Sequence, residues 1–450
     1  MATVTRNSKV DTLYIEQAIL SPVLNDIPSR RVDISNLISQ LIISESITSN
    51  TLNISCLIID NVGLLESFPL RGEERVRLVV KDFQDVTITY DLFLYKVDNV
   101  TPKSDGDGLS YNAYFVSYQH FIAGSTKLIR AFKGKKIVTL VDELFKEFYS
   151  SGTKTLEIEN EEDASDNLTE NQIRGTIPNM TVPQAIEFLV RRSYSTKRKT
   201  SSFRFFENSD SFFFISDEGL EDYAKLNNKI FNFTSTRIPD DPAYFEQQRN
   251  NLDSITNTNR FNTLDDMFGG AYKNNVLEID ILRKIYTKKK YDYLKDGKKY
   301  FNAGPFRTIV DRHTEDFSNE FFTENNAKEF YMIKDYMEID DFNDSALAGN
   351  KFFPEMVSNR HAFRTHLNST MVEAVGPCRL DVTAGSIINL EITKFKAAVN
   401  KVERNEQLSG KYIVKSVNRV MNGETSKNRY ILVKRDWNDV KFTYEFGGGR

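Results

Sequence analysis

The first ~130 residues alternate hydrophobic and polar positions in a way that is typical of β-strands. Val, Ile and Thr alternate with polar residues over 32–60, and the same alternation returns over 75–81. Two aromatic-rich strands are expected at 91–100 and 111–121, joined by a loop of Pro, Ser, Asp and Gly, which favour turns. The pattern predicts a β domain at the start of the chain.

The hydrophobic spacing changes to a helical one at 136–149, where apolar residues recur on one face. A second helix is expected at 182–195, because Thr181 and Gln184 can form a capping box. A hairpin follows at 202–216, with its turn at 208–211. We expect Leu140, Leu144 and Phe148 to be buried against the second helix or the hairpin.

The rest of the chain is mixed and polar to about residue 370, and its last ~75 residues return to the β pattern. Three segments of the first β region, 72–83, 92–100 and 111–120, occur in the same order as 385–395, 411–420 and 429–437. In this alignment Val97–Val100 lies over Val417–Val420. The pattern alone leaves a duplicated domain and a chance likeness of β-hairpins equally open.

Composition and charge exclude several classes of protein. With 450 residues, 40% hydrophobic and 12% aromatic, the chain can bury the cores of two to four domains, so global disorder is excluded. The net charge of −4 argues against a surface built throughout for nucleic acid or anionic lipid. Cys56 and Cys378 are too far apart to indicate a disulfide framework.

No targeting or membrane segment is predicted. Nowhere do about eighteen mainly apolar residues run together, as a membrane-spanning helix requires. Asp11 and Glu16 interrupt any apolar region of a signal peptide. We therefore expect synthesis in a cytoplasm without targeting.

The residues that could carry chemistry do not form a known catalytic pattern. The four histidines are scattered, and two of them are five positions apart, off the spacing of helical zinc ligands: His120, His313, His361 and His366. No nucleophile elbow, phosphate-binding loop or dinucleotide fingerprint is present. We expect no catalytic, cofactor-binding or metal-binding residues.

Charged runs leave alternatives open. The acidic stretch 157–170 and the run 335–345 are typical of solvated loops, although paired carboxylates also serve glycoside hydrolysis. The basic stretches 191–199 and 283–299, the second with interleaved tyrosines, fit either a nucleic-acid footprint or a solvated strand edge. An enzyme and a structural assembly protein both remain possible from these patterns.

In their order along the chain, the predicted strands, helices and hairpin resemble those of the central hub proteins of contractile-tailed phage baseplates. The closing segments are also similar to late-control and spike proteins of related injection machines, including type VI secretion. The match is weakest over 300–370. The segments that carry the resemblance are 58–80, 92–100, 114–121, 129–145, 177–195, 203–220, 260–293, 382–395, 408–421 and 429–437.

The resemblance implies a mainly β fold with α+β insertions and two tail-tube-like β-barrel domains. The first tube-like domain would be 1–125, followed by an α+β domain at 126–219. The second would be split, with 220–245 joined to 375–450. Residues 246–374 would form a mixed insertion that packs with the 126–219 domain.

The resemblance also implies a function that needs no catalytic residue. Two tube-like domains in each of three chains would give a ring that adapts a sixfold tail tube to a threefold spike around a DNA channel. Expected partners are the chain itself as a homotrimer, a central spike protein, a tail-tube or tube-initiator protein, and tape-measure and baseplate wedge proteins. The location would be the tail baseplate of a virion, with DNA passing only transiently. The alternative is a tail-associated enzyme that degrades carbohydrate or peptidoglycan.

Overall fold

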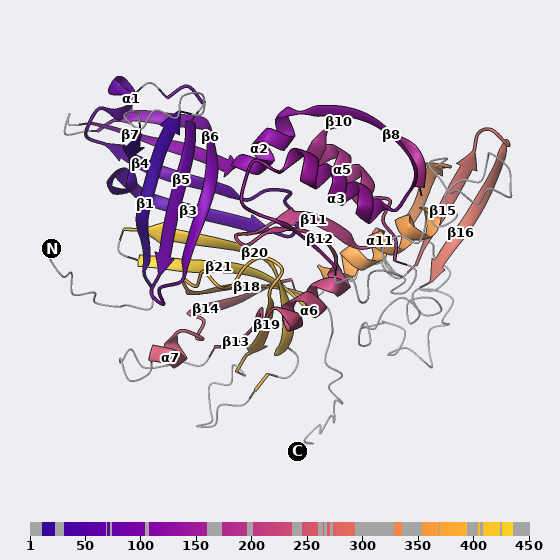
Figure 1. Cartoon of the computed structure of the whole chain (residues 1–450). Helices are drawn as coiled ribbons and strands as arrows, with labels where there is room; N and C mark the ends of the chain where they lie inside the picture. Colours follow the sequence, from indigo (N-terminus) through magenta and orange to yellow (C-terminus); the bar gives the residue numbers. More distant parts are fainter. Residues whose placement is uncertain are drawn as a thin grey trace, which may run out of the picture.

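A computed structural model describes residues 11–22, 31–68, 70–72, 74–103, 108–159, 173–195, 201–235, 245–259, 264, 268–270, 273–292, 328–334, 353–368, 370–393, 404–405, 408–423 and 425–434. The fold is mainly β, as predicted, with one large sheet of thirteen strands and three small sheets. The predicted barrels are not closed in the described part of the chain. Instead, strands from both ends of the sequence join in one open sheet (Figure 1).

The first half of the large sheet, which we call the first half-sheet, comes from the N-terminal quarter of the chain. Its strand order is β3-β4-β7-β6-β5-β1-β2. Alternate side chains point into one core, which includes Leu41, Ile54 and Leu78. The strands are β1 (Leu13–Pro22), β2 (Val32–Asp33), β3 (Ile38–Ser46), β4 (Asn53–Asp60), β5 (Glu74–Asp82), β6 (Thr87–Pro102) and β7 (Leu109–Ser117).

The second half-sheet has the order β14-β18-β21-β20-β19-β13. Its core includes Val372, Ile388 and Tyr430. One of its strands, β14, comes from the segment predicted as an insertion at 246–374. The strands are β13 (Ile230–Thr234), β14 (Ser254–Asn259), β18 (Met371–Pro377), β19 (Ile387–Glu391), β20 (Gly410–Asn422) and β21 (Thr425–Val433).

The two half-sheets share a strand order. Numbered along the sequence, the strands β1, β3, β4, β5, β6 and β7 and the strands β13, β14, β18, β19, β20 and β21 both lie in the spatial order 2-3-6-5-4-1. The two long strands also share a bulge, because β6 skips Tyr95 in its pairing with β7 and β20 skips Lys415 in its pairing with β21. One direction differs: β1 runs antiparallel to β5, whereas β13 runs parallel to β19.

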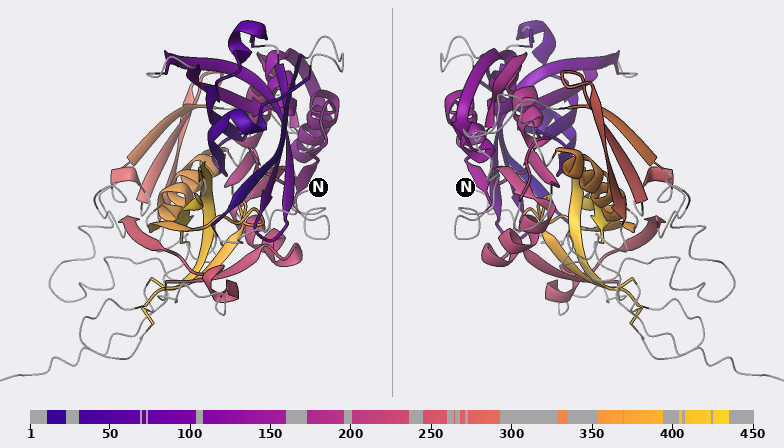
Figure 2. Two further views of the ribbon diagram at one scale, coloured as in Figure 1. Left: turned by 90° about the vertical axis from the view of Figure 1, so that its left-hand side faces the viewer. Right: turned by 90° about the vertical axis from the view of Figure 1, so that its right-hand side faces the viewer.

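An α+β unit lies between the half-sheets in sequence and beside them in space (Figures 1 and 2). Its helix α3 matches the predicted helix 136–149, and its helix α5 begins at the predicted capping box of Thr181 and Gln184. The elements are α2 (Tyr118–Ser125), β8 (Lys127–Lys135), α3 (Ile137–Phe148), β9 (Leu156–Ile158), β10 (Ile173–Thr181), α5 (Val182–Val190), β11 (Phe203–Glu207), β12 (Phe212–Ser216) and α6 (Asp217–Leu226).

The predicted apolar face of α3 is buried at Leu140 and Leu144, which join one core with α5 and with Phe212 of β12. The prediction for Phe148 was wrong, because its ring is only partly buried and lies under the guanidinium of Arg130. Tyr149, one position later, is buried in its place.

A third group of elements lies at the far end of the molecule from the first half-sheet (Figure 1). Strands β15 (Lys273–Asp280), β16 (Ile285–Asp292) and β17 (Lys328–Ile333) form a small sheet, and α11 (Phe353–Leu367) packs on β15. Helix α11 also reaches the α+β unit, where Arg360 Nε donates to Ser201 O at 3.0 Å. The remaining described helices are the short α1 (Leu64–Ser67) and α7 (Phe245–Gln248).

The core position of Leu144 can be tested by truncation. Leu144→Ala should lower the free energy of unfolding by about 2–5 kcal/mol, because it removes buried methyl groups and leaves a cavity. Urea titration measures this loss. The matched control is Lys146→Ala on the exposed face of α3, which should cost at most about 0.5 kcal/mol. Equal losses for the two variants would contradict the assignment of this face to the core.

Candidate functional site at the junction of the half-sheets

The two half-sheets meet where β3 pairs with β20. The antiparallel register runs from Ser46 opposite Ser416 to Gln40 opposite Asn422. Strand β20 serves two partners along the same edge: its start pairs with β19, and its later part pairs with β3. The change of partner falls at the bulge of Lys415. We call this contact the junction.

A fully buried ion pair lies in the junction. Arg419 Nη1 of β20 donates to Glu45 Oε1 of β3 at 2.5 Å, and both side chains are 0% exposed. Arg419 Nη2 also donates to Val382 O at 2.9 Å. Glu45 Oε2 accepts from Ala384 N at 3.2 Å. These hydrogen bonds are what a buried charge requires.

Electrostatics in the junction favour a permanent positive charge on the arginine. Burial by itself lowers the pKa of Arg419, but the neighbouring Glu45 carboxylate more than reverses this and raises that pKa above its ordinary value. The neighbouring Tyr90 hydroxyl has its pKa raised by burial and stays protonated. Arg419 and Glu45 therefore form an ion pair whose opposite charges cancel, rather than an acid–base site.

The hairpin of the α+β unit is wedged against the junction. At its turn, Ser209 Oγ donates to the Glu45 carboxylate and lies 2.7 Å from Tyr90 Oη of β6. Asn208 Nδ2 donates to Ala384 O at 3.1 Å. The carboxylate of Glu207, also fully buried, accepts from Leu52 N at 3.2 Å. The hairpin, β3 and the loop before β19 thus share one polar network.

Gly385 allows the loop before β19 to lie close to the hairpin. Its φ is +91°, a conformation that favours glycine, and a Cβ there would lie 3.2 Å from carbons of Phe206 and Leu220. Its N–H donates to Val414 O at 2.9 Å. A side chain at this position would strain the backbone and crowd the core.

Sequence reasoning missed the junction pair. One signal was available: Arg419 lies between Val417 and Met421 on one face of its strand, as Glu45 lies between Ile43 and Ile47. A charge on an apolar face of a strand indicates a buried, paired group. Which charge pairs with which is not visible, because the two residues are 374 positions apart.

The histidines and cysteines are not brought together. His120 lies in the first turn of α2 beside Tyr149, so the strand expected over 111–121 was wrong beyond Ser117, where β7 ends. His361 of α11 contacts Gly269 O and packs edge-on against Phe330. His313 and the side chain of His366 lie outside the described residues. Cys56 and Cys378 are buried free thiols, each with a pKa raised to about 12 by burial. In the described ranges no cluster of three or more metal-ligating side chains is found.

Most of the charged stretches considered above are only partly described. The acidic run 335–345 and most of 157–170 lie outside the described residues, as do 196–199 and 293–299 of the basic runs. The described part of the second basic run is β16, which forms an exposed edge of its sheet. None of the described helices is long and apolar enough to cross a membrane.

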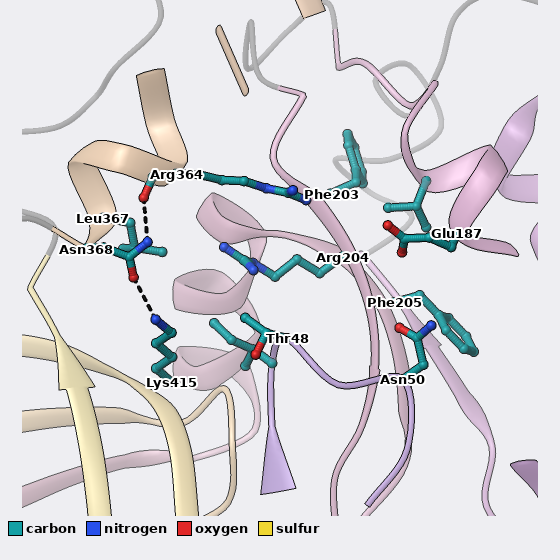
Figure 3. Close-up of a pocket in the computed structure, with 12 residues that line it drawn as sticks. Thr48, Asn50, Glu187, Phe203, Arg204, Phe205, Arg364, Leu367, Asn368 and Lys415 are labelled. Carbon is teal, nitrogen blue, oxygen red and sulfur yellow. Dashed lines mark hydrogen bonds between the residues drawn. The ribbon is translucent and has the colours of Figure 1, made fainter. Parts of the chain in front are cut away.

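A cavity of about 210 Å³ opens beside the junction (Figure 3). Three cations line it, Arg204, Arg364 and Lys415, together with the carboxylate of Glu187. Arg204 is paired with Asp217, and Lys415 Nζ donates to Asn368 Oδ1 at 2.7 Å. Burial, and then Arg204, lower the pKa of Lys415. Among the described lining residues Glu187 is the one carboxylate, whereas glycoside hydrolysis uses two.

The tip of the small sheet exposes large apolar side chains. Six of them are more than half exposed: Ile281, Leu282, Ile285, Tyr286, Tyr331 and Ile333. Lysines and Arg283 surround them on β16 and its turn. An exposed apolar patch with a polar rim is typical of a protein interaction surface.

No protein-family model matches the sequence, and no curated protein matches it. Several solved structures are similar in fold. The tail protein from Neisseria meningitidis MC58 gives a TM-score of 0.50 at 8% identity, over 94% of this chain and 96% of that chain. The 43 kDa tail protein of prophage MuSo2 from Shewanella oneidensis gives 0.48 at 8% identity, over 93% and 98%. The E. coli c3393 protein, a type VI secretion component, gives 0.43 at 7% identity, over 95% and 78%. The first likeness shows a shared fold along nearly the whole of both chains.

The buried pair predicts strong coupling between Glu45 and Arg419. Glu45→Leu or Arg419→Met alone should lower the free energy of unfolding by about 3–5 kcal/mol, because each leaves one buried charge unpaired. The double variant should lose clearly less than the sum of the two. Urea titration of the four proteins in a double-mutant cycle measures the coupling. Simple additivity within about 0.5 kcal/mol would contradict the pairing.

Burial of His120 predicts a pH dependence of stability. Burial lowers its pKa below the ordinary 6.5, and the Glu207 charge offsets this only in part. The unfolded chain therefore binds a proton at a higher pH than the folded chain does, so stability falls as the pH falls below about 6.5. His120→Phe removes this titration. Between pH 7 and pH 5 the native protein should lose more stability than the variant, as measured by urea titration; parallel curves would contradict the burial of this imidazole.

Proposed function

We propose that this protein is a structural hub of a contractile-tail baseplate, in which three chains form a ring of six tube-like units. The observation that carries the proposal is the repeat in the large sheet: two half-sheets with one strand order and one shared bulge, joined edge to edge by β3 and β20. Each half-sheet would be one tube-like unit. The fold shared with the Neisseria meningitidis tail protein supports the same class.

Two equivalent units in one chain would allow the protein to match two different symmetries. A chain with two equivalent units contributes two positions to a ring, so three chains supply six positions while keeping threefold symmetry. Such a ring can contact a sixfold tail tube on one side and a threefold spike on the other. The function needs flat interfaces and a stable junction, and the buried Glu45–Arg419 pair supplies the second of these.

The division of the chain follows from this proposal. The first unit would be 1–125 without α2. The second would join 220–245, without α6, to 375–450, and it would take β14 and the start of β18 from the intervening segment. The α+β unit, from α2 to α6, and the rest of 246–374 would lie outside the ring. The exposed apolar tip of the small sheet would then face a partner such as the spike or a baseplate wedge protein.

Other partners follow from the same class. The chain would bind a tube or tube-initiator protein above, with a tape-measure protein and DNA passing through the lumen of the virion tail. The net charge of −4 suits a lumen that does not hold phosphates, because a strongly basic lining would bind them.

The alternative is a tail-associated enzyme that degrades carbohydrate or peptidoglycan. The cavity beside the junction would be its site, with Glu187 as the acid. A zymogram on peptidoglycan with native protein and Glu187→Gln tests it. Lysis by the native protein and not by the variant would favour the enzyme over the hub.

The hub proposal predicts a homotrimer. Light scattering, with the spike protein present because some interfaces lack a stable free form, should give complexes that contain three times 51.8 kDa of this chain. Electron microscopy down the symmetry axis should show six similar lobes around an opening. A chain that stays monomeric with the spike, or a trimer without a central opening, would contradict the proposal.

A further inference from the structure

The later part of β6 is an open strand edge. One edge of β6 pairs with β7 over Leu92–Pro102, but the other pairs with β5 only over Thr87–Phe93. Beyond the bulge of Tyr95, the segment Lys96–Pro102 has no strand on that second edge in the part of the chain that the structure describes. We call this segment the β6 edge.

The equivalent segment of the second half-sheet is paired. Followed through the neighbouring strands, Lys96 of β6 corresponds to Ser416 of β20, and Asp98 corresponds to Asn418. A second bulge at Asn99 and Val100, which β20 lacks, then brings Thr101 to the position of Val420. In β20 this segment pairs with β3 and forms the junction. The β6 edge is therefore a second copy of a junction surface, without its partner strand.

Burial shows the difference between the two copies. In β20 the side chains of Val417, Arg419 and Met421 are buried by the junction. In the β6 edge Val97, the equivalent of Val417, is only half-buried, and Pro102, the equivalent of Met421, is exposed.

The equivalent of β3 is also an open edge. Strand β14 pairs with β18 on one side and ends the large sheet on the other, within the described residues. Ile42 of β3 faces Ser55 of β4, and Thr256 of β14 faces Glu373 of β18. Ser55 pairs with Tyr114 of β7, which pairs with Lys96 of β6. In the same way Glu373 pairs with Ile431 of β21, which pairs with Ser416 of β20. Lys96 and Ser416 are each the first residue after the shared bulge, so Ile42 and Thr256 occupy corresponding positions.

We propose that the β6 edge of one chain pairs antiparallel with β14 of a second copy of this chain, and that this contact repeats the junction between chains. The register follows from the correspondence. Val420 faces Ile42 within the chain, so Thr101 faces Thr256 of the next copy. By the same mapping Pro102 faces Ile255. The inference rests on the proposed ring and assigns the strands that close it.

Both edges suit this occupant. The missing partner of the β6 edge is a strand equivalent to β3, and the same chain carries such a strand in β14, with its outer edge open. The two edges lie in different half-sheets, so the contact is head-to-tail. A head-to-tail contact closes into a ring when its rotation matches, and two equivalent units per chain make the match threefold.

Disulfide trapping tests the register. The variant Thr101→Cys with Thr256→Cys places two thiols on facing positions, where antiparallel Cα atoms lie about 4.5–5.5 Å apart, a distance that a disulfide spans. Under mild oxidation we expect covalent dimers and closed trimers in denaturing gels without reductant. The native Cys56 and Cys378 are buried and should not interfere.

Matched controls share one cysteine with the test variant. Lys96→Cys with Thr256→Cys moves one thiol five residues along β6, beyond reach of the other, and should give monomers. Each single variant should also give monomers, because the contact joins two different edges. Cross-linking of the Lys96→Cys pair as strongly as the test pair would overturn the register.

The outcomes separate this inference from the proposed function. A trimer by light scattering that never cross-links at Thr101→Cys and Thr256→Cys overturns the strand assignment and leaves the hub standing. A covalent ladder that continues past three chains supports the strand pairing and contradicts the closed ring. A monomer without cross-links, with spike present, overturns both.

Discussion

The buried pair of Glu45 and Arg419 is the interaction on which the arrangement of the large sheet depends. Removing two charges from water costs several kcal/mol per ion, so both must keep their partners. A shift of one residue in the register of β3 and β20 would turn one charge to the other face and leave its partner buried alone. The pair therefore allows one register at the junction. The position of the hairpin turn also depends on the pair, because Ser209 Oγ donates to the same Glu45 carboxylate.

The two copies of the junction surface differ where this pair lies. The position of Arg419 in β20 falls in β6 at the second bulge, formed by Asn99 and Val100, so the β6 edge carries no arginine to desolvate. An edge that is open in the free chain and closed in an assembly benefits from this, because opening leaves no buried charge unpaired. In the proposed ring, the junction within a chain would be permanent and that between chains reversible.

Local patterns in the sequence were sufficient for α3, for the start of α5 and for the hairpin, whereas the segment of α2 was wrongly predicted as the end of a strand. The sequence left the repeat open, and in the observed register Val97 and Asp98 coincide with Val417 and Asn418. The junction could not be predicted, because a strand pattern identifies a buried face and not the strand beside it. Strand β14 was missed for a related reason: an edge strand of Ser, Thr and Asn has little hydrophobic alternation.

The bulge explains how one strand can serve two units. An extra residue bends a strand and increases its local twist, so the edge beyond the bulge points away from the edge before it. In β20 the edge before Lys415 pairs with β19 of its own half-sheet, and the edge beyond pairs with β3 of the other. Without the bulge, the whole edge of β20 would face in one direction, so the strands paired with it would belong to one half-sheet. A single extra residue at Lys415 thus allows β20 to pair with strands of both half-sheets.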